Sequence, residues 1–159
     1  MSTTIERPRE QVILARVAKR ANAEACGVDE HFISLMVERF YASIREDDLL
    51  SAIFANRISN WPEHLERMKS FWRSILFNSG EFSGNPMAKH MTIPGLEEVH
   101  FRRWLELFYA TLRELEQHEE GTVLVAERAR AIADSLFTGI TIRRDGISGS
   151  KAGKDLPHV

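Results

Sequence analysis

The chain has 159 residues, a length at which one domain can bury about two thirds of its unfolded surface without disulfides. Its 21 basic and 23 acidic residues leave a net charge of −2, which argues against nucleic acid or an anionic membrane as the main partner. A single cysteine, Cys26, excludes an internal disulfide. We see neither a secretory signal nor an apolar run long enough to cross a bilayer, and we therefore expect a cytoplasmic protein.

Helical periodicity dominates the sequence. Apolar residues recur three and four positions apart and no alternating pattern persists, so the sequence predicts an all-α fold. Residues 1–27 are expected to form an N-terminal helical extension that Gly27 closes. Residues 28–142 are expected to form one helical domain. Residues 143–159, rich in Gly, Ser and Lys, are expected to form a flexible C-terminal tail.

Four long helices and one short one are expected in that domain, in the following order. After the N-cap Asp29 comes a helix with Tyr41 beside the stripe Ile33, Met36, Val37, Phe40 and Ile44. Pro62 starts the next, whose inner face is His64, Met68, Phe71, Trp72 and Ile75. Asn85 and Pro86 start a short helical turn that contains His90. The last two helices begin near Leu96 and after Gly121.

Two kinds of metal centre fit the sequence poorly. A di-iron carboxylate centre needs two Glu-x-x-His pairs, and only Glu97 with His100 has that spacing. Glu97 is explained as well by the preference for an acidic residue in the first turn of a helix. A zinc site is disfavoured because His64, His90 and His100 fall on separate elements.

A haem pocket fits the sequence better. His90 lies in a short helix bounded by Gly and Pro, and His64 heads an otherwise apolar helix face. A flat cofactor between them would also account for the aromatic residues Phe40, Phe54, Phe71, Trp72, Phe82, Trp104 and Phe108. Each of these residues taken alone is more often part of an ordinary core. A cofactor-free helical interaction module therefore remains the alternative.

A series of short motifs runs through the domain. They are Phe40-Tyr41, Ile53-Phe54, Trp61-Pro62-Glu63-His64, Phe71-Trp72, Phe82-Ser83-Gly84-Asn85-Pro86-Met87-Ala88-Lys89-His90 and His100-Phe101-Arg102-Arg103-Trp104-Leu105. In order and spacing they resemble the third group of the truncated haemoglobins. The resemblance covers about residues 28–140, and it implies a globin-like two-over-two helical sandwich that binds haem b, iron protoporphyrin.

The resemblance also implies roles for individual residues. His90 corresponds to the proximal ligand of the haem iron, its other ring nitrogen donating to a backbone carbonyl. Tyr41, His64 and Trp104 resemble the distal polar residues that contact the bound ligand. Further haem contacts are implied for Phe54, Arg67, Met68, Phe71, Phe82, Met87 and Lys89, of which Arg67 and Lys89 are the candidate propionate partners. Phe82 departs from the family, which often has tyrosine there.

The implied function is binding of dioxygen and other diatomic gases at a five-coordinate or weakly six-coordinate iron. Donors from Tyr41 and Trp104 would each stabilise partial negative charge on dioxygen by on the order of 1–3 kcal/mol, which slows its release. We therefore expect redox handling of oxygen, nitric oxide or peroxide, as in a nitric oxide dioxygenase or a peroxidase, with electrons from an unidentified reductase. Oxygen transport is disfavoured, and no catalytic residue is assigned.

Overall fold

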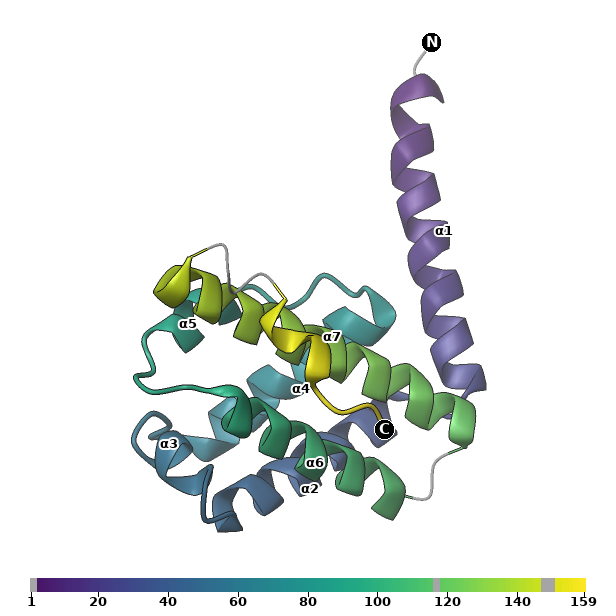
Figure 1. Ribbon diagram of the computed structural model, residues 1–159. Coiled ribbons are helices and arrows are strands. Elements are labelled where there is room, and N and C mark those ends of the chain that lie inside the picture. The colour runs from purple at the N-terminus through teal and green to yellow at the C-terminus, as the bar shows by residue number, and fades with distance from the viewer. Residues whose placement is uncertain (1–2, 116–117, 147–150) are drawn as a thin grey trace.

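The computed structural model describes residues 3–115, 118–146 and 151–159, with side chains from Arg9 onward. All the regular structure in these residues is helical, which confirms the all-α prediction. The helices are α1 (Thr3–Ala25), α2 (Glu30–Glu46), α3 (Ser51–Ala55), α4 (Trp61–Phe77), α5 (Pro86–Met91), α6 (Glu98–Glu114), α7 (Glu119–Asp145) and the short 3-10 helix η2 (Ala152–Asp155). Figure 1 shows a body made of α2 to α7, from which α1 projects.

The centre of the body is α2, which packs against both α4 and α6. Its N-cap is Asp29, as predicted, because the Asp29 carboxylate accepts a hydrogen bond of 2.8 Å from the backbone N–H of Phe32. The predicted stripe is buried along its whole length, from Ile33 to Ile44. Such packing of a long apolar face stabilises a helix far more than its intrinsic propensity does.

The helices α4 and α5 start in the same way. Asn60 and Asn85 each accept a hydrogen bond of 3.1 Å from the backbone N–H three residues ahead, and each helix has proline in its first turn. The short helix predicted after Asn85 is confirmed as α5. It packs against α7, yet none of its own six residues is buried.

The end of the chain differs from the predicted flexible tail. Helix α7 continues to Asp145, and residues 151–159 pack against the body, while 147–150 lie outside the described residues. Leu156 is only 2% exposed. The Tyr109 hydroxyl donates to the Pro157 carbonyl at 2.7 Å.

Arginine side chains of α6 and α7 hold the rest of this segment. The guanidinium of Arg130 donates to the carbonyls of Leu156 at 3.1 Å and Lys154 at 3.0 Å, and Arg102 reaches the carbonyl of Asp155 at 3.4 Å. Helical periodicity did not predict this packing because the segment is held by backbone groups that bind distant side chains, not by an apolar stripe of its own.

The projecting helix α1 occupies the predicted N-terminal extension. Only its last turns rest on the body, where Ala23 is buried and the Arg20 guanidinium lies 4.7 Å from the centre of the Phe77 ring. Earlier apolar residues are exposed, namely Val12, Ile13, Leu14 and Val17. No helix in the described part of the chain is both long and apolar enough to cross a membrane.

Candidate functional site

One side of the site is formed by His90, near the end of α5. Its Nδ1 atom lies 2.6 Å from the carbonyl oxygen of Pro86, one helical turn earlier. Because a carbonyl oxygen only accepts, Nδ1 must carry the proton, and Nε2 of the neutral ring keeps its lone pair. This is the tautomer that a metal-ligating histidine needs, with the ring orientation fixed by the backbone.

A second group of residues is formed by α2, α3 and α4, which bring together three of the predicted site residues. Tyr41 is only 6% exposed, and its ring lies edge-on to His64 at 5.1 Å and to Phe54 at 5.9 Å between ring centres. Burial raises the pKa of the Tyr41 phenol far above its ordinary value. The hydroxyl therefore stays protonated and acts as a hydrogen-bond donor at any physiological pH.

His64 is the one side chain with an unsatisfied buried polar atom in the described part of the chain. Its Nε2 atom is buried and has no hydrogen-bond partner there. The pKa of His64 is lowered to about 4, first by burial and then by the positive charges of Arg67 and Lys89. His64 is therefore neutral near pH 7.

Trp104, on α6, belongs to a separate stack of aromatic rings. Its indole lies nearly parallel to Phe108, at 5.5 Å between ring centres, and edge-on to Phe40 at 5.3 Å. Trp72 also stacks on Phe108, at 5.1 Å between ring centres. The orientation of Trp104 is thus fixed by the rings of Phe40 on α2 and Phe108 on α6.

The remaining predicted haem contacts lie on α4, on α5 and in the segment between them. Phe71 and Phe82 meet edge-on at 5.2 Å, and the Arg67 guanidinium lies 5.9 Å from the centre of the Phe82 ring. Met87 packs against α7, because a Cβ atom at Gly139 would lie 2.6 Å from its Cε. Met68 is partly buried against the core.

Trp61, for which no role was predicted from the sequence, lies in the same cluster. Its ring centre lies 5.7 Å from that of His64, 6.1 Å from Tyr41 and 6.5 Å from Phe54. The guanidinium of Arg45 covers it at 4.4 Å. One signal was present in the sequence, since residues three apart such as Trp61 and His64 share a helix face.

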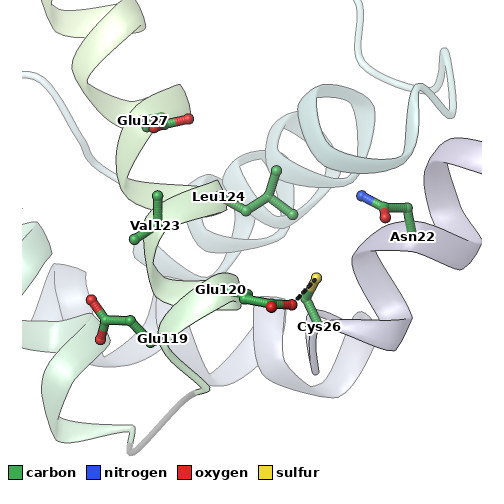
Figure 2. Close-up of a pocket in the computed structure, with 7 residues that line it drawn as sticks. All are labelled: Asn22, Cys26, Glu119, Glu120, Val123, Leu124 and Glu127. Atoms are coloured by element: carbon green, nitrogen blue, oxygen red, sulfur yellow. Dashed lines mark hydrogen bonds between the residues drawn. The ribbon is translucent and has the colours of Figure 1, made fainter.

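Two other places in the molecule lack the features of this site. Glu97 and His100 cap α6 reciprocally, with the Glu97 N–H donating to His100 Nδ1 at 3.1 Å, so the pair has a structural role. A shallow hollow of about 390 Å³ lies between α1 and α7, and its lining includes Cys26 and three glutamates, of which Glu120 lies beside Cys26 (Figure 2). None of the predicted site residues lines that hollow.

The chain is similar to known proteins in sequence and in fold. The family model of bacterial-like globins matches residues 23–137. A group 3 truncated haemoglobin of Campylobacter jejuni is 32% identical over 110 residues, which are 67% of this chain and 86% of that protein. The crystal structure of a group III truncated haemoglobin from the same organism matches with a TM-score of 0.66 at 30% identity, covering 70% of this chain and 91% of that one.

The chain belongs to the third group of truncated haemoglobins. As a globin it is a haem protein that binds diatomic gases, and the globin fold expected from the sequence is confirmed. The family model begins at residue 23, so most of α1 lies outside the part that this truncated haemoglobin shares with its family. The cofactor-free interaction module that the residues alone left open is thereby disfavoured.

Proposed function

We propose that this truncated haemoglobin holds haem b through Nε2 of His90 and uses Tyr41, His64 and Trp104 to retain a diatomic ligand for redox chemistry. The substrates in this proposal are oxygen, nitric oxide or peroxide, with electrons from a reductase. The observation that carries it is the buried Nε2 atom of His64, which has no hydrogen-bond partner among the described residues, in a ring that packs edge-on against Tyr41. Buried polar atoms are nearly always hydrogen-bonded, so such an atom indicates a place for a polar ligand.

The donor set fits a haem on the proximal side. In its neutral form His90 offers the lone pair of Nε2, and the hydrogen bond from its Nδ1 to the Pro86 carbonyl orients the ring. When bound, the haem supplies a site for diatomic ligands and for one-electron exchange. Arg67 and Lys89, whose charges both reach His64, are suited to pair with the two propionates.

The distal side is suited to holding a ligand that carries partial negative charge. The Tyr41 hydroxyl stays protonated and donates. The indole N–H of Trp104 is also a donor, and its ring is fixed by the stack on Phe108. Each such donor is worth on the order of 1–3 kcal/mol, so two together slow the escape of dioxygen by roughly thirtyfold or more. Slow escape favours reaction over delivery.

Two measurements test the proposal. The purified protein should show a strong Soret band that shifts when dithionite and carbon monoxide are added. The oxygen-loaded protein, mixed with nitric oxide in a stopped-flow instrument, should then convert it to nitrate much faster than oxygen dissociates. A protein without a Soret band after addition of hemin would overturn the haem assignment. Nitric oxide that reacts only as fast as oxygen leaves would overturn the redox role alone.

A further inference from the structure

The outer surface of the molecule has a second hollow, directly over the distal cluster. It has a volume of about 300 Å³ and is lined by Arg45, Ser51, Ala52, Ala55 and Trp61. Three of these five side chains are small, so little bulk separates solvent from the ring of Trp61.

The ring of Trp61 separates this hollow from the site. Outside, it lines the hollow and is covered by Arg45 at 4.4 Å. Inside, it contacts Tyr41 and His64 at 6.1 and 5.7 Å between ring centres. Trp61 is therefore in contact both with the hollow and with the distal polar groups.

The surroundings of this ring allow it to move. The neighbouring helix α3 has five residues, none of them buried, and its N-cap makes no side-chain hydrogen bond. Trp61 itself is at the first position of α4 and only half buried. Residues at helix ends with little packing open locally at low free-energy cost.

The region around Arg67 and Lys89 is a less suitable passage. Both charges act on the His64 ring, and under the proposed function both side chains pair with the haem propionates. A ligand on that path would have to displace paired charges, whereas the path past Trp61 requires the rotation of one ring.

We propose that the hollow lined by Arg45, Ser51, Ala52, Ala55 and Trp61 is the outer end of an access route for diatomic ligands, with Trp61 as its gate and Arg45 holding the gate closed. This inference rests on the proposed function, because it needs haem in the site. A gate changes only the barrier, so it alters the association and dissociation rate constants by the same factor and leaves Kd unchanged. A lost distal hydrogen bond instead changes the dissociation rate constant and Kd together.

The experiment is laser flash photolysis of the carbon monoxide complex of the haem-loaded protein, combined with dissociation by ligand replacement. Arg45→Gln removes a cation–π contact at an exposed site and should raise both rate constants about two- to fivefold. Trp61→Ala removes the whole ring and should raise both by more. Ala52→Trp fills the hollow from an exposed position and should lower both. Ala131→Trp, at an exposed position on α7, is the matched control and should change neither.

The outcomes separate the two proposals. Unchanged rate constants in Trp61→Ala and Ala52→Trp, with faster association in His64→Ala, would overturn the gate and place the route at His64. A change in Kd without a change in association would also overturn it. In both cases the carbon monoxide complex still forms, so the proposed function survives, whereas a protein that forms no such complex fails the proposed function first.

Discussion

The two sides of the site differ in how firmly the fold holds them. His90 lies on α5, a six-residue helix without a buried residue, and one hydrogen bond to the Pro86 carbonyl orients its ring. Tyr41 lies on α2, a 17-residue helix that buries a complete apolar face. Under the proposed function, attachment of the iron therefore depends on a few local bonds, while control of the bound ligand depends on the core. Substitutions on the two sides should accordingly have different consequences.

The largest effect is expected on the lightly held side. His90→Gly removes the proposed iron ligand, so the protein should lose its characteristic Soret spectrum and retain haem poorly. Imidazole added to the solution should restore the spectrum, because it can fill the space with the same donor atom. His31→Ala, an exposed histidine on α2, is the control and should leave the spectrum unchanged. A normal spectrum in His90→Gly would remove the proximal assignment.

On the firmly held side we expect an effect on ligand escape and not on haem binding. Tyr41→Phe removes one donor worth about 1–3 kcal/mol, so the oxygen dissociation rate constant should rise roughly 5- to 150-fold. Carbon monoxide, which carries less charge, should respond much less. Stopped-flow measurement of both gases checks this.

Tyr109→Phe is the matched control for that variant. It removes the hydroxyl that holds the Pro157 carbonyl, far along the chain from Tyr41. It should lower the free energy of unfolding by about 1 kcal/mol and leave oxygen dissociation unchanged. Equal oxygen dissociation rate constants in the two variants would contradict the role of Tyr41.

A smaller effect is expected when the same substitution is made at a helix N-cap on each side of the site. Asn85→Ala and Asn60→Ala each remove a cap worth about 0.5–2 kcal/mol to its helix. Because α5 has no buried residue to keep it in place, Asn85→Ala should speed haem loss several-fold. The packed helix α4 should keep its geometry in Asn60→Ala. Haem transfer to an excess of an acceptor apoprotein measures both, and equal rates would mean that packing does not distinguish the sides.

The smallest effect is expected from pH. His64 has a pKa of about 4 in the folded protein against an ordinary 6.5, so its ring stays neutral from pH 8 down to about pH 5. Oxygen dissociation should therefore be flat over that range and change only as pH approaches 4. Because of the same shift, the unfolded chain binds a proton on His64 at a higher pH than the folded protein does. The free energy of unfolding therefore falls as pH drops from 6.5 towards 4. An inflection of the wild-type dissociation rate near pH 6.5 would contradict the buried, neutral ring.

Local features of this fold could be predicted from sequence. Asp29 as a cap, the buried stripe from Ile33 to Ile44, and a short helix opened by Asn85 and Pro86 all depend on neighbours within about four residues. Each was confirmed. The family and its globin fold also followed, because the motif that ends at His90 is specific.

Contacts between distant segments could not be predicted in the same way. The packing of Leu156 depends on Arg130 and Tyr109, and the role of Trp61 depends on Arg45 and Tyr41. Lys69 is a third case, since its ammonium is almost buried yet bonded to Glu38 of α2 at 2.9 Å. In a helical pattern such residues look like ordinary surface or core positions, and only the arrangement of the helices gives them partners.

The projecting helix α1 has a consequence for amide hydrogen exchange. A helix of 23 residues extends about 35 Å, and only its last turns, near Ala23, are covered by the body. The earlier turns, with Leu14 67% exposed, are held by little beyond their own backbone hydrogen bonds. Isolated helical segments shorter than about 12–15 residues, such as these turns, are only marginally stable in water. Protection should therefore decline steadily from Ala25 back towards Arg9, so that one continuous helix contains both slowly and rapidly exchanging amides.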